Sequence, residues 1–383
     1  MRVCLVYDCL YPHTVGGVER WYRALAERLA TEGHDVDYVT LRQWGAEEDP
    51  GVPGVRVVAV GPRMPLYTGG RRRIVPPLVF GAGVLWHLLR HGRRYHAVHT
   101  ASFPFFSVLA AAAARRLHRF ELLVDWFEVW TLEYWRQYIG RFPGRVGFAV
   151  QRACIRVPQR AFCFSRLHMG RLRAEGVRVE PTFVGGLLAG RSASRTPLDT
   201  PAPVAVFAGR HIPEKRVPAL VDALDRARRE VPELRGRLLG DGPERPEVLR
   251  RIAAAGLGPS VEAPGFVDAD EVEHTIHGAL CLVLPSRREG YGLVVAEALA
   301  LGTPSVVVAG PDNAAVELVE EGENGAIARS ASPEDLGEAI LRVHRGGAEL
   351  RRSTRAWYER NRERLSIEAS LEAVVEAYTA RHG

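Results

Sequence analysis

Two glutamates stand eight residues apart in a segment that otherwise reads as buried. Glu289 and Glu297 belong to SRREGYGLVVAEALALGTP, where glycines and apolar side chains dominate the residues between them. The preceding run ALCLVLPS, residues 279 to 286, predicts a strand. Glu289 is therefore expected in the loop at the carboxyl end of that strand, where Gly290 and Gly292 let the backbone approach a ligand closely.

A helix that begins near Gly292 would give this loop an anion site, because the first N–H groups of a helix have no partner within it. Glu297 would then lie in the first two turns. A carboxylate there can accept a pair of hydrogen bonds from vicinal hydroxyl groups, such as those of a ribose. The alternative is that Glu297 is solvated and serves the helix dipole, and for an isolated pair of glutamates this alternative is the more common one.

The turn FAGRHIPEKRV, residues 207 to 217, carries two cations that suit a diphosphate. We expect a strand to end at Gly209 and a helix to begin near Val217, with Arg210 and Lys215 between them. A guanidinium and an ammonium at the carboxyl edge of a sheet can neutralise phosphate oxygens. Surface charge is the alternative, but Lys215 is the only lysine among 51 basic residues, which favours a specific role for it. For the adjacent arginine, Arg216, we accept surface charge.

A pair of glycines follows the first predicted strand. Gly16 and Gly17, in HTVGGVERW, permit the backbone to approach a phosphate or a sugar closely. The segment does not have the GxGxxG spacing, so a dinucleotide site is not indicated. By itself it predicts no more than a strand-to-helix turn.

Strands and helices alternate along most of the chain, which predicts two doubly wound α/β domains, each with a parallel sheet covered on both faces. A stretch rich in Pro, Gly, Ser and Thr at residues 181 to 203 predicts the linker. We expect a first domain at 1–185, a second at 186–355 and a terminal helical segment at 356–383. Ligands of such sheets bind beyond the carboxyl ends of the strands, so a cleft between two facing domains is the expected site.

The expected strands are short apolar runs bounded by Gly, Pro or polar residues. The first helix is expected at residues 16 to 32. The strands are expected at 2–10, 36–41, 55–60, 97–100, 122–127 and 161–165 in the first domain and at 204–209, 235–242, 261–267, 279–286 and 305–310 in the second.

Composition and charge narrow the class of protein. The 383 residues, 46% hydrophobic and 25% charged, suffice for two globular cores. Five scattered cysteines without CxxC spacing indicate neither zinc nor a disulfide framework and fit a reducing cytoplasm. The net charge of +6 favours anionic partners, but the arginines are spread out and no nucleic-acid-binding motif is present, so nucleic acid is not an expected partner. No signal peptide or membrane-spanning segment is predicted, and we expect a cytoplasmic protein.

Together these pieces resemble the retaining nucleotide-sugar glycosyltransferases of the GT-B fold, specifically glycosyltransferase family four, whose two Rossmann-like domains face each other across a cleft. The resemblance covers nearly the whole chain, and several motifs in the right order are a more specific signal than one. They are AGRHIPEKR (208–216), LLGDGPE (238–244), GFV (265–267), the E-x7-E motif from Glu289 to Glu297, and NAAVELVEEGENG (313–325).

The resemblance assigns the contacts of the donor. Glu297 would hold the ribose hydroxyls, Glu289 would contact the donor sugar, and Arg210 and Lys215 would neutralise the diphosphate as it leaves. The remaining donor contacts would come from Phe266 and Val267 at the base, from Gly292, Leu293 and Val294 at the sugar and phosphate, and from Gly16 and Gly17 closing over the donor. The implied reaction retains the anomeric configuration, uses no metal or other cofactor, and transfers to a saccharide, a lipid-linked or a small-molecule acceptor.

One strand end departs from the family pattern. Members commonly have a histidine there that faces the donor sugar, whereas this chain reads LLVDWFEVW, with Asp125 in that place. Either Asp125 takes over as a sugar ligand, or the donor contact differs. His99, at the end of AVHT, is a second candidate, although a strand-end histidine is more often structural. Trp126 and Glu128, among further aromatic residues, could form a sugar-stacking acceptor site, and an aromatic core edge is the equally weighted alternative.

Two D-x-D triplets do not indicate a metal-dependent GT-A enzyme. Asp35–Asp37 begins a predicted strand, and DADE at 268–271 is typical of a helix N-cap with acidic residues in the first turn. His274 and His277 lack a convincing third ligand, so we expect no metal site.

An apolar segment bracketed by arginines, RRRIVPPLVFGAGVLWHLLRHGRR at residues 71 to 94, raises the hypothesis of a contact with a membrane surface. Its apolar stretch is short for spanning a bilayer, but an amphipathic helix there could lie on an anionic membrane. Members of the family that act on lipid-linked acceptors often do this from the first domain. A helix packed on the sheet, with its arginines in solvent, is the slightly favoured alternative.

Other functional classes share some of these features. A GT-B sugar-nucleotide epimerase has the same fold and needs no acceptor, so an assay with donor alone would reveal it. A phosphorylase requires a lysine for pyridoxal phosphate, and the only lysine is already assigned. A non-catalytic basic protein that binds membrane or nucleic acid would have no need of the E-x7-E motif.

Overall fold

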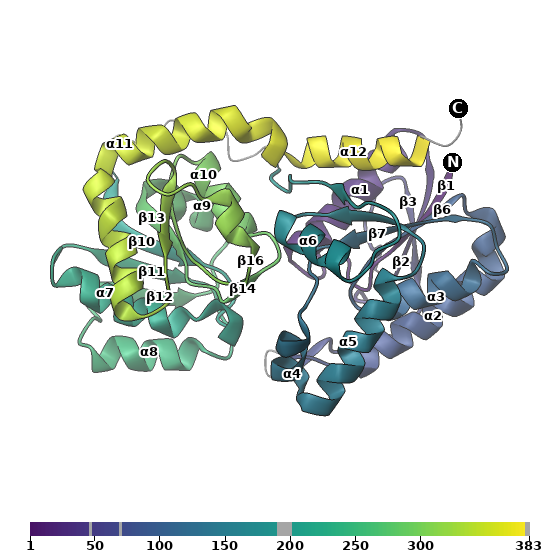
Figure 1. Ribbon diagram of the computed structural model, residues 1–383, viewed down its shortest axis with the longest axis horizontal. Coiled ribbons are helices and arrows are strands. Elements are labelled where there is room, and N and C mark those ends of the chain that lie inside the picture. The colour runs from purple at the N-terminus through teal and green to yellow at the C-terminus, as the bar shows by residue number, and fades with distance from the viewer. Residues whose placement is uncertain (46–47, 69–70, 190–200, 380–383) are drawn as a thin grey trace. The chain divides into compact units, whose positions relative to one another are not determined.

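The computed structural model describes residues 1–45, 48–68, 71–189 and 201–379, which form two compact units (Figure 1). Unit 1 comprises Met1–Leu187 and Ile367–Gly383, and unit 2 comprises Leu188–Ser366. Each unit has a parallel sheet with helices packed against it, which confirms the prediction of two doubly wound α/β domains. The centre of the expected linker, residues 190–200, lies outside the described residues.

Unit 1 is built on a seven-stranded sheet whose strands all run parallel. In spatial order the strands are β3 (Val55–Ala59), β2 (Asp35–Thr40), β1 (Arg2–Val6), β6 (Ala97–Ala101), β7 (Glu121–Trp126), β8 (Arg160–Cys163) and β9 (Thr182–Phe183). The chain order reverses between β1 and β6, and ligands of open parallel sheets bind at the carboxyl edge beside such a point. The central strands are buried almost throughout, because helices cover both faces.

Eight helical segments and one short hairpin complete the described part of unit 1. Helix α2 packs against α3, α4 against α5, and the carboxy-terminal helix α12 against α1. The helical segments are α1 (Gly17–Thr31), α2 (Val75–His91), η1 (Gly92–Arg94), α3 (Phe106–Ala114), α4 (Leu132–Ile139), α5 (Arg141–Ile155), α6 (Arg166–Ala174) and α12 (Ile367–Thr379), and the hairpin pairs β4 (Tyr67–Thr68) with β5 (Arg71–Arg72).

Unit 2 repeats this plan with a six-stranded parallel sheet, in which the order reverses between β10 and β13. In spatial order the strands are β12 (Val261–Gly265), β11 (Arg235–Leu239), β10 (Ala202–Ala208), β13 (Ala279–Leu284), β15 (Ser305–Val308) and β17 (Gly325–Ala328), and a separate pair joins β14 (Arg288–Glu289) to β16 (Asp312–Asn313). The helical segments are η3 (Pro213–Lys215), α7 (Val217–Arg228), α8 (Arg245–Ala254), α9 (Ala269–Gly278), α10 (Leu293–Ala300), η4 (Ala314–Leu318) and α11 (Pro333–Leu365).

Several predicted strands extend past the ends seen in the structure. The first was expected to reach residue 10 but ends at Val6, although Cys9 and Leu10 are buried, because a loop can also bury apolar side chains. The strand expected at 235–242 ends at Leu239, because Gly240, at φ 115°, turns the chain out of the sheet. Apolar composition therefore located the strands, and in β11 a glycine sets where the strand ends.

Candidate active site

The loops that follow β10 and β13 meet at the carboxyl edge of the unit 2 sheet, where the strand order reverses. Lys215 lies at the end of η3 after β10, and Glu289 lies in β14 after β13. The Lys215 ammonium makes an ion pair with Glu289 Oε1, and the two side chains are 19% and 11% exposed. The structure thus brings together two residues that the sequence assigned to one site.

Two further hydrogen bonds join the same loops. The backbone N–H of Arg287 donates to the carbonyl of Glu214 at 2.8 Å, and Arg216 Nε donates to the carbonyl of Pro285 at 2.8 Å. Burial lowers the pKa of Arg216, which sits at a positive φ of 49° at the start of α7. Arg216 therefore holds the loops together, and its interpretation as surface charge is wrong.

The loop after β11 is also fastened to the loop after β10. A Cβ atom at Gly240 would lie 2.0 Å from the carbonyl oxygen of Gly209, so only glycine allows this approach. The N–H of His211 donates to the carbonyl of Asp241 at 2.9 Å. These contacts place Arg210, which is exposed, on a rigid turn at the carboxyl edge of the sheet.

Helix α10 begins at Leu293, directly after Gly292, as the sequence predicts. Gly292 has a φ of 96°, and a Cβ atom there would lie 2.6 Å from the Ala315 side chain, so glycine is required at this cap. Leu293 and Val294 form the first turn and are half-buried. Glu297 is half-buried in the second turn, and the amino end of α10 therefore presents N–H groups on the same edge of unit 2 as Glu289.

An exposed aromatic residue follows the edge strand of the same sheet. Phe266 comes directly after β12 and is 85% exposed, while Val267 is half-buried. The loops are linked here too, because Gly240 N donates to the carbonyl of Gly265 at 2.8 Å. An aromatic ring that packs so little within its own unit has a face left over for a ligand.

In unit 1 the predicted sugar ligand Asp125 lies inside the core. Its Oδ2 accepts from Trp21 Nε1 at 2.8 Å, and its Oδ1 lies 2.8 Å from His99 Nε2. His99 Nδ1 in turn lies 2.6 Å from the hydroxyl of Tyr378 on α12. The side chains of Asp125 and His99 are fully buried, so this arrangement favours a structural role for both and does not support the predicted contact with a sugar.

Trp126 is also a core residue rather than a stacking surface. It is fully buried, and its indole N–H donates to Gln159 Oε1 at 2.9 Å, which favours the alternative of an aromatic core residue over stacking on an acceptor. Glu128 is half-buried and accepts from Trp130 Nε1 at 2.5 Å. Two aromatic residues of this loop, Phe127 and Trp130, are half-buried and reach the surface, and Trp130 contacts Glu128.

The glycine pair Gly16 and Gly17 lies at the start of α1, as predicted. Gly16 is its N-cap, and a Cβ atom at Gly16 would lie 2.3 Å from Glu19 Oε2. The first of the two glycines therefore makes room for a carboxylate of its own helix, and Gly17 is half-buried beside it.

One buried ion pair at the carboxyl edge of the unit 1 sheet was not predicted from the sequence. Arg72 of β5 makes an ion pair with Asp8, which follows β1, and the two side chains are almost completely buried. The Arg72 guanidinium also lies 4.8 Å from the centre of the Phe103 ring. Burial lowers the pKa of Arg72. The sequence feature that could have indicated this pair is Asp8 itself, because it is a carboxylate within an otherwise apolar run.

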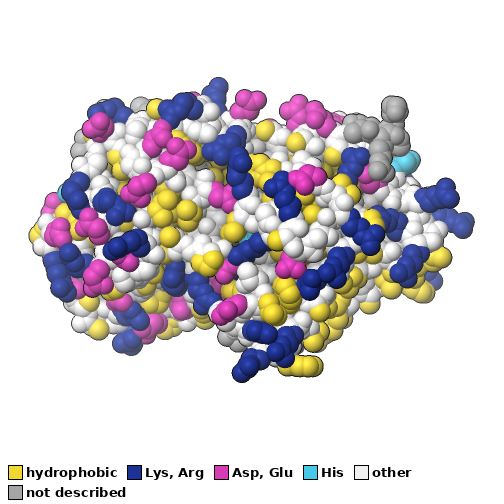
Figure 2. Space-filling model, in the orientation of Figure 1, with side chains coloured by type: hydrophobic (Ala, Val, Ile, Leu, Met, Phe, Trp, Pro, Cys, Tyr) yellow, Lys and Arg dark blue, Asp and Glu magenta, His cyan; other side chains and the backbone are white. Residues whose placement is uncertain are grey.

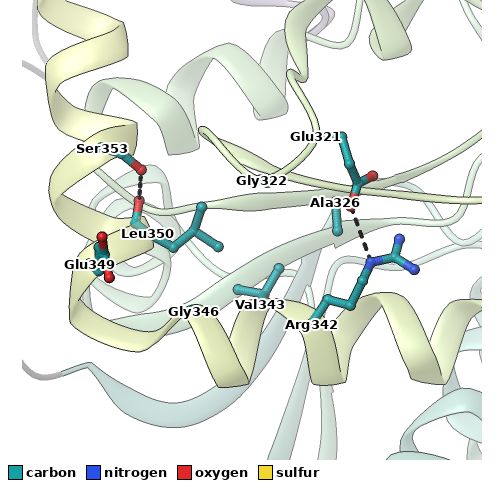
Figure 3. A pocket seen from close by; sticks show the side chains of 10 residues that line it. Glu321, Gly322, Ala326, Arg342, Val343, Gly346, Glu349, Leu350 and Ser353 are labelled. Atoms are coloured by element: carbon teal, nitrogen blue, oxygen red, sulfur yellow. Dashed lines mark hydrogen bonds and ion pairs between the residues drawn. The ribbon is translucent and has the colours of Figure 1, made fainter.

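A pocket of about 340 Å³ in unit 2 contains none of the predicted site residues (Figure 3). It lies between β17 and α11, next to the point where Gly347 interrupts the helix, and Arg342 spans it to reach Glu321 at 3.1 Å. Among the described residues, no group of three or more His, Cys, Asp or Glu side chains is placed to hold a metal ion. Within the same ranges no helix is long and apolar enough to cross a membrane.

Comparison with known families accounts for most of the chain. Residues 191–364 match the family described as glycosyl transferases group 1, and residues 16–185 match the family described as glycosyl transferase 4-like domain. The chain is a family four-like glycosyltransferase. The resemblance seen in the sequence is thereby confirmed, and the two matches fall one in each unit.

Individual relatives and solved structures agree with this family. A D-inositol 3-phosphate glycosyltransferase from Nocardioides sp. is 35% identical over 170 residues, which are 40% of this chain and only 37% of the relative's length. The sucrose-phosphate synthase from Thermosynechococcus elongatus has a TM-score of 0.78 at 20% identity, over 99% of this chain and 98% of that one. Anabaena HepE, solved in complex with UDP, has a TM-score of 0.76 at 18% identity, over 99% and 100% of the two chains. The likeness to these structures shows that the glycosyltransferase has the GT-B fold.

Proposed function

We propose that this glycosyltransferase moves a sugar from a nucleotide-diphosphate donor to an acceptor hydroxyl, with retention of the anomeric configuration and without a metal ion. The observation that carries the proposal is the partly exposed Lys215–Glu289 pair at the reversal point of the unit 2 sheet, beside the amino end of α10. That edge is where an open parallel sheet binds its ligand. It offers an ammonium, a guanidinium and helix N–H groups to a diphosphate.

In the proposed reaction the bond between the anomeric carbon and the diphosphate oxygen breaks, and its electron pair stays on the oxygen. The acceptor oxygen forms the new bond on the face from which the diphosphate departs, and its proton passes to the leaving phosphate. Negative charge grows on the diphosphate during this step. Lys215, held by its ion pair with Glu289, and Arg210, carried on a turn that backbone hydrogen bonds hold, stabilise this charge.

The two glutamates bind different parts of the donor. Glu297, in the second turn of α10, accepts hydrogen bonds from the ribose hydroxyls, and Glu289, held by Lys215, accepts from hydroxyls of the transferred sugar. Phe266 and Val267 bind the base, with the exposed ring of Phe266 stacking on it. Asp125, Trp126 and His99 are left out of this scheme, because all three are buried in unit 1.

We also propose that the acceptor is presented at an anionic membrane surface, to which α2 binds. One side of α2 packs on α3, and the opposite side exposes an apolar stripe at helical spacing. Figure 2 shows hydrophobic side chains gathered on unit 1 over α2. The stripe consists of Val75, Leu78, Trp86 and Leu89. Exposed arginines flank its two ends in the sequence, with Arg73 before it and Arg90, Arg93 and Arg94 after it. Apolar residues flanked by arginines complement the acyl boundary and head groups of an anionic bilayer.

The donor site is tested by thermal denaturation with a panel of UDP-, GDP-, dTDP- and ADP-sugars. A ligand that binds only the folded state raises the midpoint as its concentration rises. We expect one donor to stabilise the wild type, and Glu297→Ala and Lys215→Ala to lose that response. Leu249→Ala, an exposed position on α8, is the matched control and should keep the response. If no donor or nucleoside diphosphate shifts the midpoint at millimolar concentration, the transferase proposal fails.

The membrane contact is tested by flotation with vesicles of phosphatidylglycerol and phosphatidylcholine. We expect the wild type to float with the anionic vesicles and Leu78→Glu to remain in solution, because a carboxylate would enter the apolar stripe. Leu249→Glu introduces the same charge on unit 2 and should float like the wild type. Equal flotation of all three proteins would contradict α2 as the contact.

A further inference from the structure

Unit 1 has a hollow at the amino edge of its sheet, opposite the edge at which Asp8 and Arg72 lie. Its volume is about 640 Å³. Its lining includes Ala97 and Glu121, the first residues of β6 and β7. Loops at this edge carry no part of the predicted donor site, so the hollow needs an explanation of its own.

Four arginines line this hollow and come from two separate segments. Arg93 and Arg94 belong to η1, which directly follows α2, and Arg115 and Arg119 lie between α3 and β7. Within the described ranges, none of the four makes an ion pair with a carboxylate. Their positive charges are therefore not neutralised by the unit that holds them.

The remaining polar groups of the lining add to this positive character. The only carboxylate in the described lining, Glu121, already accepts from Arg160 Nε at 2.6 Å. His96 Nδ1 accepts from the N–H of Arg2 at 3.0 Å, so the neutral imidazole carries its proton on Nε2 and is a donor. Every uncommitted polar side chain in this lining is thus a hydrogen-bond donor.

Four guanidinium groups around one hollow repel one another, and partial burial adds to the cost at Arg115, whereas the other three arginines are exposed. Burial lowers the pKa of Arg115, and no acidic neighbour counters it. An anion with several acceptor oxygens would offset both effects, since guanidinium groups bind phosphate oxygens two at a time. A carboxylate offers fewer oxygens to four such groups, which favours phosphate.

We propose that this hollow, lined by Arg93, Arg94, Arg115 and Arg119, binds a phosphate-bearing ligand, which is either the head group of an anionic lipid or a soluble phosphate ester. The two sources share the chemistry that the arginines recognise. The lipid source fits the position of η1, because this segment continues α2, whose exposed apolar stripe ends at Leu89. The binding site does not depend on the proposed transferase activity.

The test is a calorimetric titration of the full chain with inorganic phosphate at low ionic strength, carried out in the Lys215→Ala background so that the donor site does not contribute. We expect one site, with Arg94→Gln and Arg119→Gln each weakening the affinity by about tenfold or more. Arg116→Gln is the matched control, because Arg116 is exposed in the same turn but does not line the hollow, and it should leave the affinity within about twofold. Absence of binding, or an equal loss in all three variants, would overturn the proposal.

The source of the phosphate is then decided by two ligands. If the lipid head group is the ligand, Arg94→Gln lowers binding to phosphatidic acid vesicles, and the soluble compound glycerol 3-phosphate competes only weakly. If the ligand is soluble, glycerol 3-phosphate binds with an affinity that Arg94→Gln abolishes, and vesicle binding does not change. A failure of the donor panel with an intact phosphate site would remove the transferase proposal and leave this one standing.

Discussion

Two of the carboxylate–base pairs that the sequence pointed to, Lys215–Glu289 in unit 2 and His99–Asp125 in unit 1, differ in their access to solvent. In unit 2 the Lys215–Glu289 pair is 19% and 11% exposed. In unit 1 the His99–Asp125 pair is fully buried. The sequence offered both pairs as candidates for chemistry, because both follow apolar strands. The difference shows that the type and spacing of residues identify a polar pair, whereas access to a ligand separates a site from a core network.

The buried pair in unit 1 ties four elements together. Asp125 on β7 accepts from Trp21 on α1, and His99 on β6 contacts both Asp125 and Tyr378 on α12. Each member satisfies a polar group that would otherwise be buried without a partner, which is the condition under which such networks stabilise a fold. The network therefore fastens the carboxy-terminal helix to the sheet of unit 1.

Replacement of Asp125 by alanine tests whether this residue is structural or a sugar ligand, because the two roles predict different effects on stability and on rate. We expect Asp125→Ala to destabilise the protein by about 3–5 kcal/mol, because it leaves Trp21 and His99 buried without their partner. The midpoint of thermal denaturation should fall by roughly 10 °C. The folded fraction, assayed at low temperature, should keep kcat within a few-fold of wild type. A large loss of kcat with an unchanged midpoint would restore Asp125 as a contact of the donor.

Replacement of Lys215 should have the opposite signature. We expect Lys215→Ala to lower kcat/KM by about 10²–10³, because a fixed positive charge beside the leaving diphosphate is lost. The midpoint of denaturation should fall by less than in Asp125→Ala, since both side chains of the Lys215–Glu289 pair keep some contact with water. Lys215→Arg keeps the charge and should recover part of the activity, although the planar guanidinium cannot reproduce the compact ammonium. A drop in stability without a loss of rate would make Lys215 a structural residue.

The sequence predicted the fold better than it predicted the state of individual side chains. Apolar runs and glycines were enough to place the strands, and the only lysine pointed to the residue that pairs with Glu289. Burial could not be predicted in the same way, because Asp125 and Trp126 at the end of β7 and Glu289 just after β13 all stand at the carboxyl end of an apolar run. Their partners come from distant parts of the chain, since Trp21 of α1 donates to Asp125 and Trp126 donates to Gln159, which lies between α5 and β8. The Asp8–Arg72 pair was missed for the same reason, since 63 residues separate its partners.

A second buried network makes the stability of unit 1 depend on pH. His87 Nε2 lies 2.7 Å from the hydroxyl of Tyr95, which donates to Asp37 Oδ2 at 2.5 Å. Burial, together with the nearby His91, lowers the pKa of His87 to about 4. Between pH 6.5 and pH 4 the unfolded chain therefore binds more protons at this position than the folded chain does, and stability falls as the pH falls.

We expect His87 to contribute a loss of about 2–3 kcal/mol on going from pH 7 to pH 4, because the lowering of its pKa from 6.5 to about 4 corresponds to roughly 3 kcal/mol. The measurement is urea denaturation of the wild type and His87→Gln across this range. The difference in free energy of unfolding between the two proteins should change with pH below 6.5 and remain constant above it. A constant difference throughout would show that His87 does not titrate in this window.

The exposed Phe266 of unit 2 and the buried Trp126 of unit 1 extend the comparison to aromatic residues. Phe266 is 85% exposed, so its removal costs the fold little packing, and the midpoint of denaturation of Phe266→Ala should equal that of the wild type. If its ring stacks on the base of the donor, the loss is about 1–2 kcal/mol, which raises the dissociation constant of the donor by roughly 5- to 30-fold. Phe142→Ala removes a ring from α5 of unit 1 that is also largely exposed, at 74%, and should leave donor affinity unchanged. Unchanged affinity in both variants would mean that the base is held by Val267 and the backbone alone, and that exposure of an aromatic ring at this edge does not identify a binding residue.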